Sequence, residues 1–141
     1  MSKREQQVGY LVKQLQSLLR LNMEKALIPH TLTVSQYSCL HHLRSEPGIS
    51  AAELARAIFM TRQSMNTLLQ QLLDRGLVAR PARPDSGRAL PTRLTAEGVK
   101  LLEAAQAGVD EVEQRMLAGL DPAGLSALSQ GLNACVRALG G

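Results

Sequence analysis

Hydrogen-bonding side chains without a carboxylate fill one face of the stretch TRQSMNTLLQQLL, which begins at Thr61. Arginine pairs well with guanine O6 and N7, asparagine and glutamine pair with adenine N6 and N7, and hydroxyl groups suit a base or a phosphate. A merely solvated helix face would carry Glu and Lys pairs, but no acidic residue occurs here before Asp74. The stretch therefore predicts a helix that reads DNA bases, through Thr61, Arg62, Gln63, Ser64, Asn66, Thr67 and Gln70.

The opposite face of that helix is apolar and predicts burial of Met65, Leu68, Leu69, Leu72 and Leu73. Thr61 suits the N-cap, and Arg75 and Gly76 suit the C-terminal end. Upstream, Ser50 and Glu53 form a capping-box pattern that opens the short helix SAAELARAI. Two short helices joined by a turn of three or four residues are typical of a helix-turn-helix.

A stiff basic loop, ARPARPDSGRALP, follows this pair of helices. Its prolines exclude a helix interior or a central strand, and Asp85 to Arg88 is a tight-turn pattern. Residues 77–80 and 90–95 are expected as short strands of a hairpin that presents the loop as a wing. If the preceding helix lies in the major groove, Arg88 reaches the adjacent minor groove, with Asp85 fixing the turn. The remaining wing arginines are expected on phosphates: Arg80, Arg83 and Arg93.

The distribution of charge supports a polyanionic partner. The chain has 141 residues, a net charge of +4 and 2 % aromatic residues, which favours one mainly helical domain. Residues 61–93 hold six Lys or Arg and two acidic residues, whereas residues 94–141 hold three and six. A basic surface is the footprint of nucleic-acid binding, although a solvated basic face without a partner gives the same pattern. No apolar run is long enough for a membrane span, and two cysteines suit a reduced, cytoplasmic protein.

Long amphipathic helices are expected at both ends of the chain. Residues 8–26 repeat apolar residues at helical spacing, Thr95 caps a further long helix, and Asp121-Pro122 opens the last one. The last two helices carry a heptad seam, formed by Leu102, Ala105, Val109, Val112 and Met116 and by Leu125, Leu128, Leu132, Cys135 and Leu139. This apolar surface predicts a homodimer; an intramolecular bundle in a monomer is the alternative.

Together, these features resemble the MarR family of bacterial transcriptional regulators over nearly the whole chain. The family's wing pattern, an Asp and an Arg followed by Leu-Thr and a Gly that opens the fifth helix, is matched by Asp85, Arg88, Leu94, Thr95 and Gly98. The resemblance implies a homodimeric winged helix-turn-helix repressor on a pseudo-palindromic double-stranded operator. Residues 1–141 would form one domain, with dimerisation helices at about 1–30 and 99–141 and a DNA-binding lobe at about 33–98.

The resemblance also implies a small effector, because many members bind phenolic carboxylates between the dimerisation helices and the lobe. By position, that crevice would be lined by Asn22, Ala26, Tyr37 and His41, with His42 beside them. A regulator without an effector, or a redox-responsive one acting through Cys39 or Cys135, is the alternative. We expect no enzyme activity, because there is no phosphate loop or nucleophile motif, and no cofactor or metal site.

Overall fold

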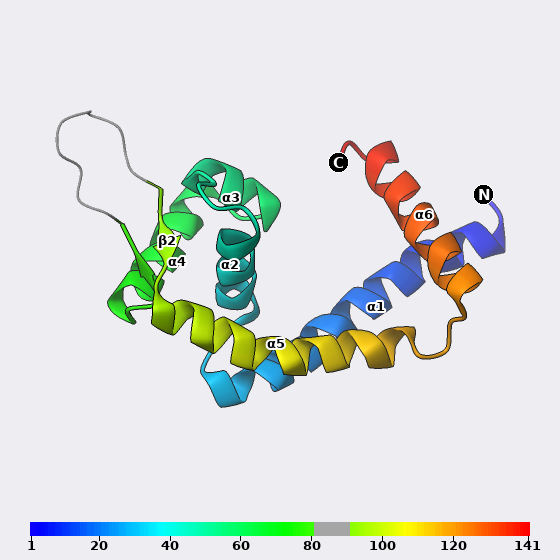
Figure 1. Ribbon diagram of the computed structural model, residues 1–141. Helices are drawn as coiled ribbons and strands as arrows, with labels where there is room; N and C mark the ends of the chain where they lie inside the picture. Colours follow the sequence, from blue (N-terminus) through cyan, green and yellow to red (C-terminus); the bar gives the residue numbers. More distant parts are fainter. Residues whose placement is uncertain (81–90) are drawn as a thin grey trace.

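The computed structural model describes residues 1–80 and 91–141 (Figure 1). Its elements in chain order are α1 (Lys3–Leu27), the 3-10 helix η1 (Ile28–His30), α2 (Val34–Ser45), α3 (Ala51–Ala57), α4 (Arg62–Asp74), β1 (Val78–Ala79), β2 (Arg93–Leu94), α5 (Ala96–Leu117) and α6 (Pro122–Ala138). The predicted fold class, mainly helical with a small strand pair, is confirmed.

Figure 1 shows two parts joined by α5. The helices α2, α3 and α4 and the strand pair form a lobe at the start of α5. At the other end, α1, α6 and the end of α5 form an arm, where both termini lie. No helix of the described residues is long and apolar enough to cross a membrane.

Side-chain caps fix where the helices begin. The hydroxyls of Thr61 and Thr95 and the carboxylate of Asp121 accept backbone hydrogen bonds at the starts of α4, α5 and α6, as the sequence predicts. At α2 the cap is Thr33, whose hydroxyl accepts the Gln36 N–H. Ser50 accepts the Glu53 N–H, but only this half of the predicted capping box is present at the start of α3. Caps of this kind satisfy N–H groups that a helix leaves unpaired.

The strands are shorter than predicted, with two residues each. Val78 pairs with Leu94 and Ala79 with Arg93 in antiparallel register. Beyond this pair, the Thr95 N–H donates to the Leu77 carbonyl at 3.1 Å and its hydroxyl donates to the Gly76 carbonyl at 2.6 Å. The two strand pairs and the two hydrogen bonds of Thr95 therefore fasten the base of the predicted wing to the start of α5.

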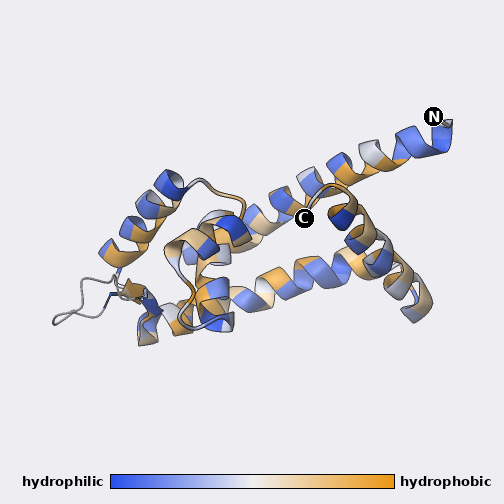
Figure 2. Cartoon of the chain, turned by 90° about the horizontal axis from the view of Figure 1, so that it is seen from above, coloured by the Kyte–Doolittle hydropathy of each residue, from blue (hydrophilic) through white to orange (hydrophobic). Residues whose placement is uncertain are grey.

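One core unites the lobe with α1 and α5. It includes Leu27, Leu40, Leu54, Met65, Leu69, Leu72 and Leu102, each no more than 1 % exposed. On α5, the first four positions of the predicted seam are buried. No residue of α6 is buried, although hydrophobic residues recur along that helix in Figure 2. The α5 part of the predicted heptad seam is thus buried within the chain at four of its five positions. The α6 part remains exposed to solvent.

Candidate nucleic-acid interface

The polar face of α4 is fully presented to solvent. All seven residues proposed for this face are exposed, namely Thr61, Arg62, Gln63, Ser64, Asn66, Thr67 and Gln70. The opposite stripe is buried at Met65, Leu68, Leu69 and Leu72, while Leu73 is half-buried. The apolar stripe therefore fixes the rotation of α4 about its axis, and that rotation aims the amides outward.

Several of these side chains already have partners within the described residues. Ser64 shares a hydrogen bond with the Thr61 hydroxyl at 2.9 Å, and Thr67 donates to the Gln63 carbonyl at 3.3 Å. The Gln70 amide donates to the Asp74 carboxylate at 2.8 Å. Within the described part of the chain, the side chains of Arg62, Gln63 and Asn66 form no hydrogen bond. These three keep their donors and acceptors available for a base edge.

A hollow of about 350 Å³ brings α4 together with the base of the wing. Asn66 and Arg80 both line it, beside Ser50 and Thr92. The Arg80 Nε–H donates to the Thr92 hydroxyl at 3.1 Å, which orients the guanidinium. Asn66 and Arg80, which lie 14 positions apart in the sequence, thus contribute polar side chains to one hollow that is large enough for a phosphate of a DNA backbone.

Arg93 lies apart from Arg80. It is paired with Ala79, and successive strand residues point to opposite faces, so Arg80 and Arg93 lie on opposite faces of the strand pair. Arg93 lines a different hollow with Arg44 of α2. The sequence grouped both arginines as phosphate contacts, and the structure separates them. Arg83, Asp85 and Arg88 lie outside the described residues, so their expected roles remain predictions.

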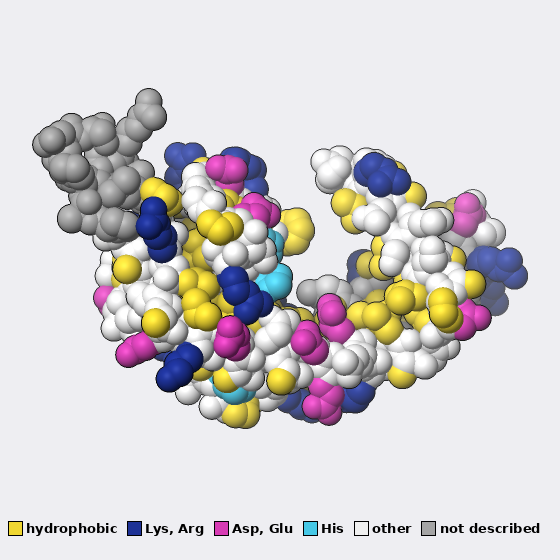
Figure 3. Space-filling view, in the orientation of Figure 1, with side chains coloured by type: hydrophobic (Ala, Val, Ile, Leu, Met, Phe, Trp, Pro, Cys, Tyr) yellow, Lys and Arg dark blue, Asp and Glu magenta, His cyan; other side chains and the backbone are white. Residues whose placement is uncertain are grey.

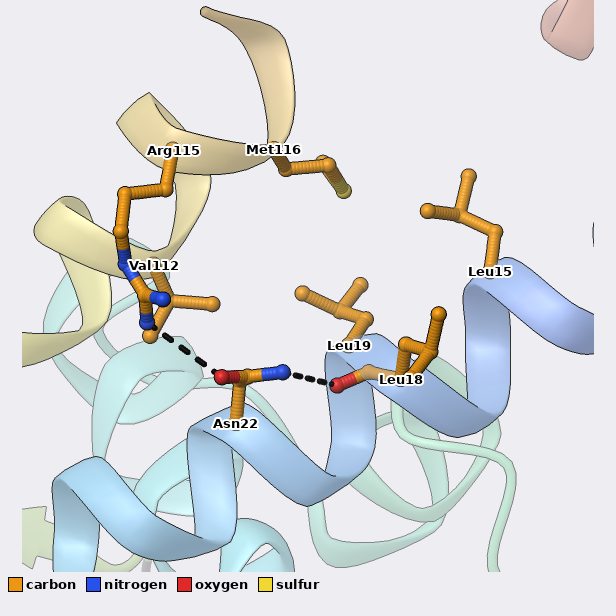
Figure 4. A pocket seen from close by; sticks show the side chains of 7 residues that line it. All are labelled: Leu15, Leu18, Leu19, Asn22, Val112, Arg115 and Met116. Carbon is orange, nitrogen blue, oxygen red and sulfur yellow. Dashed lines mark hydrogen bonds between the residues drawn. The ribbon is translucent and has the colours of Figure 1, made fainter.

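A second cavity, of about 270 Å³, lies between α1 and α5 (Figure 4). Its walls are apolar except for Asn22 and Arg115, and they comprise Leu15, Leu18, Leu19, Asn22, Val112, Arg115 and Met116. The Asn22 amide donates to the Leu18 carbonyl at 2.8 Å and accepts a hydrogen bond from Arg115 at 3.3 Å. No carboxylate of the described residues forms an ion pair with Arg115. The cavity therefore offers an apolar wall and an uncompensated cation.

Of the four predicted effector residues, only Asn22 lines this cavity. Ala26 lies at the crossing of α1 and α5, where a Cβ on Gly108 would be 3.4 Å from its methyl group. Tyr37 is buried, and its ring stacks on that of His41 with centroids 6.1 Å apart. Burial raises the pKa of the Tyr37 hydroxyl and lowers the pKa of His41. The structure does not gather the four residues into one site.

Sequence reasoning missed Arg115 altogether. Its partner Asn22 lies 93 positions away, and a lone arginine near the end of an amphipathic helix is typical of helix C-termini. No pattern in the sequence distinguishes it from a solvated arginine.

The cysteines differ in environment. Cys39 is buried, and burial raises the pKa of its thiol to about 12. A buried, protonated thiol is a poor nucleophile, so its environment argues against a redox role of Cys39. Cys135 is exposed on α6. Within the described residues no three His, Cys, Asp or Glu side chains gather as metal ligands.

Comparison with known proteins places this geometry in a family. Residues 30–89 match the family model described as MarR family. The chain is 46 % identical over 113 residues to the HTH-type transcriptional repressor Rv2887 of Mycobacterium tuberculosis, an alignment covering 80 % of this chain and 81 % of that repressor. The chain belongs to the MarR family. The predicted resemblance is confirmed.

Solved structures of this MarR-family relative share the fold. The Rv2887 complex with salicylic acid superposes with a TM-score of 0.73 and 42 % identity, covering 90 % of this chain and 94 % of the other. The Rv2887 complex with DNA gives a TM-score of 0.70 and 38 % identity, covering 94 % and 97 %. The long helices and the lobe seen in Figure 1 are therefore the architecture of a MarR-family transcriptional regulator.

Proposed function

We propose that the chain is a homodimeric repressor that binds a pseudo-palindromic DNA operator and is released by a small aromatic acid. The observation that carries DNA binding is the exposed, carboxylate-free face of α4. On this face, the side chains of Arg62, Gln63 and Asn66 form no hydrogen bond with residues 1–80 or 91–141. In the proposed complex, α4 lies in the major groove. The neighbouring hollow at Asn66 and Arg80 takes a phosphate, and Arg93 contacts the backbone from the other face of the strands. The related Rv2887 has been solved in complex with DNA.

The homodimer is supported by the uncovered apolar surface of the arm. An apolar groove of about 460 Å³ runs between the middle of α1, the end of α5 and the facing side of α6. Figure 3 shows hydrophobic side chains gathered where α6 meets α5. Leu125 is 41 % and Leu132 42 % exposed, which is unusual for leucines at regular spacing in a water-soluble helix. A second copy of the chain covers this groove and places two α4 helices on one DNA face.

Selection of duplexes from a random-sequence pool tests the DNA-binding proposal. The wild-type protein should enrich a two-fold-related sequence, and its binding constant should fall steeply as salt rises, because basic side chains displace counterions from phosphates. Gln63→Ala is expected to weaken binding by about 1–3 kcal/mol and to relax the base preference at about one position per half-site.

The matched control for Gln63→Ala is Gln130→Ala, an exposed glutamine on α6, which should leave both affinity and base preference unchanged. If Gln63→Ala lost the same affinity for every duplex, α4 would contact only the sugar-phosphate backbone of the DNA and would not read its bases. Failure of the wild-type protein to enrich any sequence would refute the operator itself.

The aromatic-acid effector is supported by the cavity at Asn22 and Arg115. A guanidinium and a carboxylate form charge-assisted hydrogen bonds, and leucine, valine and methionine walls suit an aromatic ring. The related Rv2887 has been solved with salicylic acid and with p-aminosalicylic acid. We therefore assign the carboxylate of the effector to Arg115, which Asn22 orients, and the ring to the apolar walls.

Replacing Arg115 with methionine tests this site. Titration calorimetry with salicylic acid should show at least about tenfold weaker binding to Arg115→Met, because the stem of the side chain remains while its charge is lost. Salicylamide, which has no carboxylate, should bind wild type and variant alike. Arg20→Met removes an exposed arginine that is paired with Glu24 on α1 and should not change either affinity. Unchanged salicylic acid binding to Arg115→Met would place the ligand at another site, and no binding of salicylic acid to the wild type would refute its proposed role as an effector.

A further inference from the structure

The turn between α3 and α4 holds a phenylalanine where glycine is favoured. Phe59 has a φ of 59°, in the left-handed region. It follows the C-cap residue Ile58, and the Met60 N–H donates to the Ala55 carbonyl at 2.8 Å. This hydrogen bond is typical of the Schellman ending of a helix, whose left-handed residue is usually glycine because a Cβ is crowded there.

Phe59 contributes nothing to the core of the chain. It is the only phenylalanine in the sequence and it is 96 % exposed. Its two neighbours, Ile58 and Met60, pack against the core instead. The turn therefore directs its flanking residues inward and the aromatic ring outward. Phe59 thus combines a strained backbone conformation with an exposed ring, and no contact with the described residues compensates for the strain.

The surroundings of Phe59 indicate what covers the ring. Phe59 precedes the N-cap of α4 by two residues, so its Cα lies within about 8 Å of the Thr61 Cα. Exposed arginines stand on both sides, at Arg56 and Arg62. The sequence has no acidic residue between Glu53 and Asp74. An exposed apolar ring that has an exposed arginine three residues away on each side along the chain, and that lies next to the start of α4, is complementary to a polyanion with apolar patches. It would repel the same surface of a second copy.

We propose that Phe59 is a DNA-contacting residue, whose ring packs against a deoxyribose or a thymine methyl group beside the bases read by α4. Duplex DNA presents both of these apolar groups next to its phosphates. The inference rests on the proposed binding of an operator duplex. It adds an apolar contact from the turn to the polar contacts of the helix.

Replacing Phe59 with glycine separates a binding role from a structural role. Glycine takes the left-handed conformation without strain, so Phe59→Gly should raise the thermal unfolding midpoint by about 1–4 °C. The same variant should bind the duplex selected with the wild-type protein about tenfold more weakly, because the ring loses its apolar contact. Phe59→Asn should weaken binding in the same way, since asparagine also tolerates this conformation. The salt dependence should not change, because no charge is removed.

Thr31→Gly is the matched control. Thr31 is the other non-glycine residue with a positive φ, at 54°, among the described residues. The Thr31→Gly variant should be more stable than the wild type and should bind the selected duplex with wild-type affinity.

Three results would overturn the proposal: wild-type affinity in Phe59→Gly, a fall in both its stability and its affinity, or a change in its salt dependence. A wild-type protein that binds no duplex in this assay would instead refute the operator, a result distinct from an unaffected Phe59→Gly.

Discussion

Replacing Gly98 with alanine will destabilise the protein by at least about 2–4 kcal/mol. An added Cβ would lie 2.1 Å from the Leu77 carbonyl oxygen and 3.0 Å from its carbonyl carbon. Neither backbone segment can move away, because Leu77 accepts the Thr95 N–H and the Thr95 hydroxyl accepts the Gly98 N–H at 3.1 Å. Chemical denaturation monitored by circular dichroism measures the loss. We also expect weaker duplex binding, since this junction fixes the base of the wing to α5.

Gly9→Ala provides the comparison. Gly9 lies in α1, and an added Cβ there would have no atom within 4 Å. Alanine has the higher helix propensity, so this variant should be neutral or more stable by up to about 1 kcal/mol. If Gly98→Ala unfolded at the same denaturant concentration as the wild type, the close packing of the start of α5 on Leu77 would be refuted.

Leu128→Glu should convert the proposed homodimer to a monomer. Leu128 lines the apolar groove of the arm and is 36 % exposed in the single chain. In a two-fold symmetric interface, residue 128 of both copies would be buried. An unpaired carboxylate buried at this position costs several kcal/mol per copy. We therefore expect at least about a thousandfold weaker self-association by analytical ultracentrifugation. Binding to a two-fold-related duplex should fall with it, because a monomer engages only one half-site.

A glutamate on the other side of α6 tests whether the added charge alone, rather than its position in the groove, disrupts the dimer. Gln130 is exposed and lies two residues beyond Leu128, about 200° around the helix. Gln130→Glu should remain a dimer and bind the duplex like the wild type. A Leu128→Glu protein that stays dimeric would show that copies of the chain associate through another surface or that the groove serves a different partner.

Local chemistry explains how much of the fold could be predicted. Threonine and aspartate caps, a proline at the first helical position and glycines at chain turns act within a few residues, so the sequence located the starts of α4, α5 and α6. The buried stripe at Met65, Leu68 and Leu69 likewise determined which face of α4 is exposed, because helical periodicity alone relates those positions. The strands were predicted too long because their pairing depends on register across the wing.

The apolar seam shows where local reasoning ends. Leu102 of α5 and Leu128 of α6 belong to the same kind of heptad pattern. Leu102 is fully buried within the chain, whereas Leu128 lies in an open groove. A repeat specifies an apolar face and not the surface that covers it, and only the path of the chain brings α1 and α2 onto α5 while α6 is left uncovered.

The sequence by itself determined the exposed amide face of α4 and the caps of α4 and α5, because each depends on neighbours along the chain. Only the tertiary structure joined Asn22 to Arg115, brought Asn66 beside Arg80, separated Arg80 from Arg93 and turned Phe59 outward. These relations depend on the crossing of helices and on the alternation of paired strands. Contacts between distant residues are set by how whole elements pack, and residue types and spacing do not encode that packing locally.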